Sequence, residues 1–141
     1  MRFLVVDASF VLKLILADPL QPRANSLTAG WKTAGLALCA PTLWAYEVTS
    51  VLSKLVHSGE LSDEEGRRAL TVAHALGVRL FPADSAQCRL AYDWTTRLRR
   101  AAAYDSFYLA LAQTLRCELW TADKRLHNAV NLAWVHWLGE A

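Results

Sequence analysis

The chain has 141 residues, of which 54% are hydrophobic and 20% charged, and its formal net charge at pH 7 is +2. This composition excludes an intrinsically disordered chain, which needs low hydrophobicity and high net charge, and the charge is too small to identify a nucleic-acid-binding protein by itself. The length predicts a single domain over residues 1–141, which can bury a core without disulfides or structural metals.

Short apolar runs alternate with segments of helical periodicity along the first half of the chain. The patterns predict a strand at 2–6, a helix at about 9–16 and a second helix that ends at about 33. A strand at 37–40 and a helix at 43–57 follow. Ser62 and Glu65 form a possible capping box for the next helix, which Gly77 ends.

The second half continues the alternation. It predicts a strand at 78–81, a long helix that Asp84 or Ser85 caps and that reaches about Arg100, a helix at about 104–116, a strand at 118–121, a short helix at 124–129 and a last strand at 133–137. Because the strands alternate with helices and are apolar throughout, we expect an α/β fold in which a parallel sheet lies between two helical layers, in α/β/α order.

The apolar runs are too short for a membrane span or a secretory signal. Charged residues interrupt them well before the roughly 20 residues that a membrane-spanning helix needs. We therefore expect a cytoplasmic protein with no membrane association. The three cysteines fit neither a disulfide framework nor a zinc pattern, so they are expected to be buried, reduced thiols: Cys39, Cys88 and Cys117.

Four of the thirteen acidic residues stand in apolar surroundings: Asp7, Glu47, Asp105 and Asp123. Acidic side chains are seldom buried unless they are paired, because an isolated buried carboxylate takes up a proton or destabilises the fold. Taken singly, each of the three aspartates is equally well explained as a helix cap. Capping does not explain Glu47, which falls within the first turns of its helix.

The predicted strands favour one common site for these four residues. Asp7 and Asp123 each follow directly on a strand, and ligands of an open parallel sheet bind beyond the carboxyl ends, where the strand order reverses. If the first strand neighbours the fourth, these two side chains lie side by side. Glu47 and Asp105 open helices, which usually start at the carboxyl ends, although connectivity alone does not settle the position of Asp105. We therefore expect all four carboxylates to converge.

Four carboxylates within a few ångströms of one another would repel strongly, and a divalent cation removes this conflict. Oxygen-only ligands suit Mg²⁺ or Mn²⁺, and the four scattered histidines do not suggest zinc. One or two such ions can activate water and stabilise the leaving oxygen of a phosphodiester. The acidic residues thus predict a metal site that is suited to phosphodiester hydrolysis.

The segments that carry these residues resemble the ordered acidic motifs of PIN domains, in particular the VapC-type toxins of bacterial and archaeal toxin–antitoxin pairs. The segments are residues 5–9, the helix with Glu47, residues 104–112 and residues 121–126. Each motif alone is weak, but four in the right order and spacing are specific, and they span nearly the whole chain. One departure is Ser50, where many relatives carry Asn or Ala, and it leaves the acidic residues unaffected.

The resemblance implies a PIN-like fold with a five-stranded parallel sheet and endonucleolytic cleavage of RNA that depends on Mg²⁺ or Mn²⁺. It implies that the catalytic, metal-binding residues are Asp7, Glu47, Asp105 and Asp123. It also implies that Ser9 and Thr121 support these ligands as neighbouring polar groups, that the chain forms a homodimer, and that a cognate antitoxin protein neutralises it.

Basic and aromatic residues suggest further contacts. Some basic residues near the acidic motifs are expected to bind RNA phosphates, although a solvated helix face explains each equally well: Arg97, Arg99, Arg100, Lys124 and Arg125. The helices at 43–57 and 62–76 could form an apolar groove for an antitoxin segment. Of the six tryptophans, we expect Trp44, Trp94 and Trp120 in the core and Trp31, Trp134 and Trp137 partly exposed.

Three other functions stay open. A haloacid-dehalogenase-like phosphatase would normally have a second aspartate two residues after Asp7, where Ser9 stands. A non-catalytic binding module with the same fold would be favoured by the loss of an acidic residue, but none of the four is missing. A housekeeping RNA-processing nuclease of the PIN type is a milder variant of the main hypothesis.

Overall fold

A computed structural model describes residues 2–100 and 103–140 of the chain. Its elements are β1 (Arg2–Val6), α1 (Ala8–Ile15), α2 (Gln21–Thr33), β2 (Leu36–Pro41), α3 (Leu43–His57), α4 (Asp63–Ala75), β3 (Arg79–Phe81), α5 (Ser85–Arg97), α6 (Tyr104–Leu115), β4 (Leu119–Thr121), α7 (Lys124–Val130) and β5 (Val135–Trp137). The predicted elements are confirmed in order and type. The largest difference is α5, which ends at Arg97 rather than near Arg100, because the chain turns at Arg99 into a left-handed conformation (φ 54°).

The five strands form one parallel sheet in the order β3-β2-β1-β4-β5. The predicted α/β class and five-stranded parallel sheet are therefore confirmed. The chain builds outward from β1 to β3 on one side and then returns to place β4 on the other side of β1. The strand order thus reverses between β1 and β4, which is where sheets of this kind bind their ligands.

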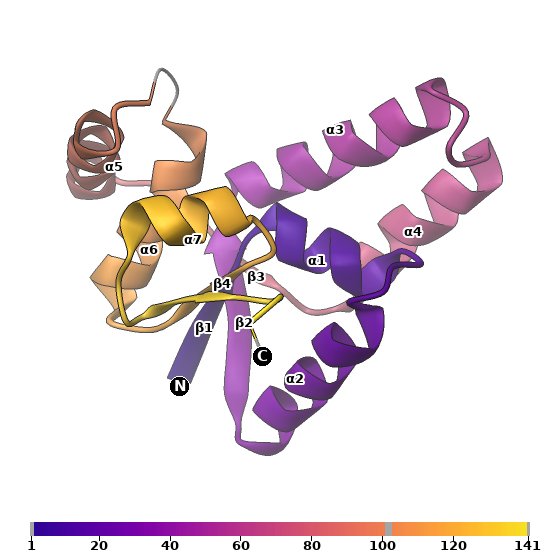
Figure 1. Cartoon of the computed structure of the whole chain (residues 1–141), viewed down its shortest axis with the longest axis horizontal. Helices are drawn as coiled ribbons and strands as arrows, with labels where there is room; N and C mark the ends of the chain where they lie inside the picture. The colour runs from indigo at the N-terminus through magenta and orange to yellow at the C-terminus, as the bar shows by residue number, and fades with distance from the viewer. Residues whose placement is uncertain (1, 101–102, 141) are drawn as a thin grey trace.

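Helices cover both faces of the central strand. Leu4, Val5 and Val6 are all at most 1% exposed, which is why β1 has no polar face. On one side of the sheet α1 contacts α2, α3 and α4, and on the other side α5 packs on α6, which lies against β1 and β2 (Figure 1). This arrangement is the α/β/α layering that the sequence predicts.

Local signals set several helix ends. Ser62 and Glu65 form the predicted capping box at the start of α4, and Asp84 caps α5 by accepting a hydrogen bond from the Gln87 amide at 2.8 Å. Gly66 lets α4 approach α3 closely, because a Cβ atom at this position would lie 2.5 Å from a methyl group of Val56. The two helices therefore form a tight hairpin that projects from the sheet (Figure 1).

The expectations for the tryptophans are mostly confirmed, whereas the expectation of buried cysteines is wrong at Cys88 and Cys117. Trp44 and Trp94 are buried, and Trp31, Trp134 and Trp137 are partly exposed. Trp120 was expected in the core but is only partly buried; it packs against the core, and its ring is stacked on His136 of the edge strand β5. All three cysteines are free, but only Cys39 is buried, whereas Cys88 is exposed. Among the described residues, no helix is long and apolar enough to cross a membrane.

Candidate active site

Asp7 lies at the carboxyl end of β1, where it is only 6% exposed. Val6 pairs with Trp120 of β4, and the Asp7 amide donates a hydrogen bond to the Trp120 carbonyl at 3.2 Å. The expectation that the first strand neighbours the fourth is therefore confirmed. Asp7 is also the N-cap of α1, since its Oδ1 accepts a hydrogen bond from the Phe10 amide at 2.9 Å.

Two hydroxyl groups complete the surroundings of the Asp7 carboxylate. Ser9 Oγ donates to Oδ1 at 2.7 Å, and Thr121 Oγ1 donates to Oδ2 at 2.5 Å. Each hydroxyl has one proton, so both must act as acceptors toward the loop after β4, where Ser9 accepts from the Ala122 amide and Thr121 from the Asp123 amide, each at 3.0 Å. The two polar residues that the resemblance placed beside the ligands thus bind Asp7 directly and fix this loop.

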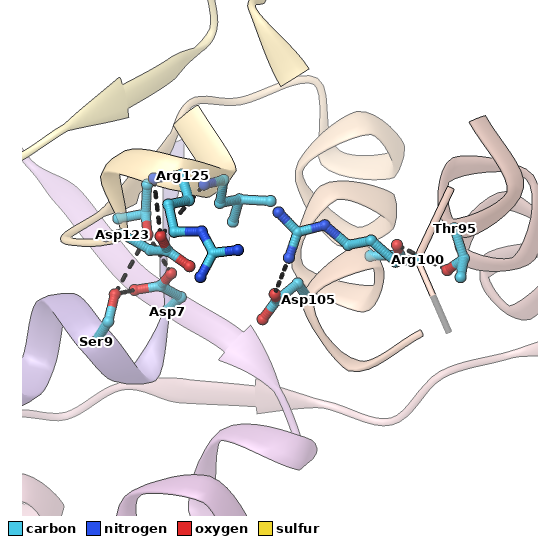
Figure 2. A network of polar contacts seen from close by, with 10 residues as sticks. Asp7, Ser9, Thr95, Arg100, Asp105, Asp123 and Arg125 are labelled. Atoms are coloured by element: carbon cyan, nitrogen blue, oxygen red, sulfur yellow. Dashed lines mark hydrogen bonds and ion pairs between the residues drawn. The ribbon is translucent and has the colours of Figure 1, made fainter. Parts of the chain in front are cut away.

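Asp123 follows β4 and caps the short helix α7. Its Oδ1 accepts hydrogen bonds from the amides of Arg125 at 2.9 Å and Leu126 at 3.2 Å. Its Oδ2 accepts no hydrogen bond from the described part of the chain and is available to a ligand. Figure 2 shows the Asp123 carboxylate next to that of Asp7, at the edge where β1 and β4 end.

Glu47 and Asp105 come from two helices that begin at the same edge of the sheet. Glu47, in the second turn of α3, is half-buried, and its Oε1 accepts a hydrogen bond from the Tyr108 hydroxyl at 2.5 Å. Asp105, in the first turn of α6, pairs through Oδ2 with the Arg100 guanidinium at 3.2 Å. Connectivity alone did not settle the position of Asp105. Because α6 starts at the carboxyl edge of the sheet, Asp105 lies at that edge as well.

The pKa values of the carboxyl groups show that their charges act on one another. Burial raises the pKa of Asp7 to about 6, although its hydrogen-bond donors oppose the rise, and the charge of Asp105 adds to it. Burial also raises the pKa of Glu47, again with a contribution from Asp105. Burial likewise raises the pKa of Asp105, which Arg100 lowers and Asp123 raises. All four carboxylates therefore share one electrostatic environment, with Asp105 acting on Asp7 and Glu47.

The carboxylates share an edge of the sheet but do not form a finished metal site. Within residues 2–100 and 103–140, no group of three or more His, Cys, Asp or Glu side chains is arranged to hold a metal ion. In the chain without an ion, Oδ2 of Asp105 is instead paired with the Arg100 guanidinium. The donor set fits a hard divalent cation, but side-chain rotation has to bring the oxygens together.

Two arginines project into the space between the acidic groups. Figure 2 shows Arg125, which follows Asp123, and Arg100, which pairs with Asp105, directed toward each other across this space. Other basic residues singled out from the sequence are held elsewhere: Arg97 lies 4.8 Å from the ring centroid of Trp94, and Lys124 lies 5.1 Å from that of Trp137. The fifth, Arg99, is exposed in the turn after α5, so Arg100 and Arg125 are the two of the five that Figure 2 shows beside the carboxylates.

The sequence reasoning missed Tyr108, which donates to Glu47 from a position that is 1% exposed. Burial and the neighbouring Glu47 charge raise the pKa of Tyr108 far above its ordinary range, so it remains a phenol. One signal was present: Tyr108 lies three residues after Asp105 in a helix, and such residues share a helix face. A single tyrosine in an apolar run, however, is indistinguishable from an ordinary core residue.

Comparison with known proteins gives a consistent result. The profile of the PIN domain family matches residues 4–132. Ribonuclease VapC9 of Mycobacterium tuberculosis is 37% identical over 125 residues, which cover 89% of each chain. The structure of VapBC2 from Rickettsia felis, bound to a promoter DNA fragment, is similar with a TM-score of 0.71 at 11% identity, covering 95% of this chain and 97% of that chain. VapC20 of Mycobacterium tuberculosis, a toxin that cleaves the sarcin–ricin loop, gives 0.66 at 17% identity, covering 89% and 94%. At such low sequence identities, these two structural similarities show a shared fold.

The raised pKa of Asp7 predicts a pH-dependent cost in stability. Its value of about 6 lies above the ordinary 3.8, so the native state binds the proton more tightly than the unfolded state does. Deprotonation therefore destabilises the fold, and stability is lost as the pH rises from the ordinary value to about 6. Without divalent ions, we expect Asp7→Asn to gain stability over the wild type across this interval, by up to about 3 kcal/mol.

Urea unfolding in EDTA, repeated across this pH range, measures the difference between the two proteins. Asp93→Asn, an exposed residue of α5, is the matched control and should show a difference that does not change with pH. A flat difference for Asp7→Asn as well would show that the burial of Asp7 carries no such cost.

Proposed function

Because this chain belongs to the PIN-domain family and is a VapC-type member of it, we propose that it is a metal-dependent endoribonuclease and the toxin of a VapBC-like toxin–antitoxin pair. The observation that supports this activity most directly is the meeting of four carboxylates from four different elements where the strand order reverses. Such a concentration of negative charge weakens a fold, so it indicates a function that requires a cation.

We propose that Asp7, Glu47, Asp105 and Asp123 hold Mg²⁺ or Mn²⁺. Burial raises the pKa of three of these groups, with a contribution from the neighbouring acidic charges, and a bound cation would favour their ionised forms. Asp123 uses only Oδ1 in its cap, and Glu47 uses only Oε1 with Tyr108. Each therefore has a second oxygen to offer, and carboxylate oxygens are the ligands that these cations prefer.

The chain's own residues would prepare the site for phosphodiester hydrolysis. A bound divalent cation supplies an activated water and neutralises charge on the phosphate. Ser9 and Thr121 donate to Asp7, which favours its ionised form and fixes the direction of the carboxylate. Arg125 and Arg100, which point into the acidic space, are suited to bind the phosphate oxygens of RNA.

The alternatives fit these observations less well. A haloacid-dehalogenase-like phosphatase needs an acidic residue at position 9, where Ser9 instead donates to Asp7. A non-catalytic binding module gives no reason to retain four mutually repelling carboxylates. A housekeeping RNA-processing nuclease would use the same site, so it differs from a toxin in its RNA target and partner rather than in its chemistry.

The activity is tested by cleavage of a mixed cellular RNA pool. We expect purified, antitoxin-free protein to cut RNA with Mg²⁺ or Mn²⁺ and to be inactive in EDTA. Asp7→Asn should lose cleavage by at least about 100-fold, since removal of such a group typically costs that much or more, while its circular dichroism spectrum stays that of the wild type.

Asp84→Asn, which caps α5 away from the acidic site, is the matched control and should cut at the wild-type rate. Sequencing of the fragment ends would identify the RNA target. If well-folded protein failed to cut any pool with either metal, the binding-module alternative would take the place of the nuclease.

A separate prediction concerns RNA binding. Arg125 is exposed and directed toward the acidic space, so Arg125→Gln should weaken RNA binding and reduce the slope of log affinity against log salt by about one. Fluorescence anisotropy in the cleavage-deficient Asp7→Asn background measures both. Arg89→Gln, exposed on α5, is the control of equal charge change. If the two variants behaved alike, Arg125 would have no specific phosphate contact.

We further propose that an antitoxin segment binds along the α3–α4 hairpin and that the chain forms a homodimer in the cytoplasm, where its RNA substrate lies. A cavity of about 400 Å³ lies between these helices, and its lining includes Leu52, Val56 and Leu70. The exposed tyrosines Tyr46 and Tyr104 border a second groove beside Glu47. Such aromatic side chains are enriched at protein interfaces, which supports a dimer.

The partner proposal predicts that the product of the adjacent gene co-purifies with this chain and suppresses its cleavage of RNA. Ser53→Arg places a long side chain in the α3–α4 cavity and should abolish co-purification, whereas Ser26→Arg on the exposed side of α2 should not. Light scattering of the free chain should give twice the 15.7 kDa of one copy. A monomeric mass, or no affinity for any adjacent-gene product, would contradict the corresponding part.

A further inference from the structure

Tyr108 is a buried residue whose hydroxyl contacts one of the proposed metal ligands. Its side chain is 1% exposed, and its hydroxyl donates to Glu47 Oε1 at 2.5 Å, which joins α6 to α3 across 61 positions of sequence. A phenol has a single proton, and here that proton is donated to Glu47.

Glu47 needs such a partner more than the aspartates do. Asp7 and Asp123 are fixed by the amides of the helices that they cap. Glu47 is longer, projects from the middle of a helix turn, and loses side-chain freedom when it is held in one position. The charge of Asp105 also repels it. Without a donor behind it, this carboxylate would swing toward solvent and away from the other three.

We propose that Tyr108 is a positioning residue that holds Oε1 of Glu47 and presents Oε2 to the divalent cation, an inference that rests on the proposed function. Among the described residues, Oε2 accepts no hydrogen bond, so it is the oxygen that remains for a ligand. Hydrogen-bond partners behind a metal ligand fix its direction and raise its affinity for the ion. Tyr108 itself touches neither the cation nor the RNA.

The test is the affinity for Mn²⁺, measured by titration calorimetry on the full chain without RNA. We expect Tyr108→Phe to weaken Mn²⁺ binding by about tenfold, and Tyr92→Phe, which removes an exposed hydroxyl on α5, to leave it unchanged. In a Glu47→Gln background, Tyr108→Phe should have no further effect, because the ligand that it positions is already lost. A structural role alone would lower the melting temperature of Tyr108→Phe and leave its Mn²⁺ affinity equal to that of the wild type.

A second measurement does not depend on how well Tyr108→Phe folds. The chain has four tyrosines, so fluorotyrosine labelling gives four ¹⁹F resonances, and phenylalanine variants of the other three assign Tyr108 by elimination. Saturating Mg²⁺ should shift the Tyr108 resonance and leave that of Tyr92 in place. Suppose that Glu47→Gln weakens Mn²⁺ binding. In that case an unmoved Tyr108 resonance, or an unchanged Mn²⁺ affinity in Tyr108→Phe, would overturn the positioning role of Tyr108. If neither Glu47→Gln nor Asp7→Asn weakened Mn²⁺ binding, the proposed metal site itself would fail.

Discussion

A carboxylate buried at the end of a central strand must be surrounded by hydrogen-bond donors, and Asp7 takes its donors from two separate segments. Ser9 and Phe10 belong to the helix that Asp7 caps, and Thr121 ends the neighbouring strand. The hydroxyls of Ser9 and Thr121 also accept hydrogen bonds from the amides of the two residues after Thr121, and so fix the loop that carries Asp123. The solution to the burial of one carboxylate therefore also positions a second.

The partners of the remaining two carboxylates compensate the negative charge less well than a cation would. Arg100 lies on Asp105 but is partly exposed, and an exposed ion pair of this kind contributes little. Tyr108 donates to Glu47 but brings no charge. The acidic edge thus remains electrostatically unfavourable in the chain by itself, which is typical of sites where stability is given up for function.

Much of this arrangement could be predicted from the sequence because it depends on local pattern. The alternation of apolar strands with helices gave the layers, and the position of Asp7 and Asp123 directly after strands placed them at the carboxyl edge. The edge of the sheet at which Asp105 lies depends on where α6 begins in space, and no local signal specifies that position. In the structure, the crossover from β3 to β4 sets where α6 begins.

The features that could not be predicted are contacts between distant segments. The pairing of Tyr108 with Glu47 joins residues that share no pattern, and the Arg100–Asp105 pair depends on where α5 ends. The partial exposure of Trp120 has the same origin, since a strand residue is buried only as far as its neighbours cover it. Propensity and periodicity describe each segment by itself, so such side-chain partners stay hidden until the chain is folded.

The dual use of Asp7 and Asp123 as helix caps has a practical consequence. Asparagine caps a helix about as well as aspartate does, so exchange of one carboxylate oxygen for an amide nitrogen removes the charge and leaves the helix start intact. Alanine at either position would remove the charge and the cap together. The charge can therefore be removed without loss of the cap, which makes asparagine variants suitable for trapping the intact chain with an uncut RNA.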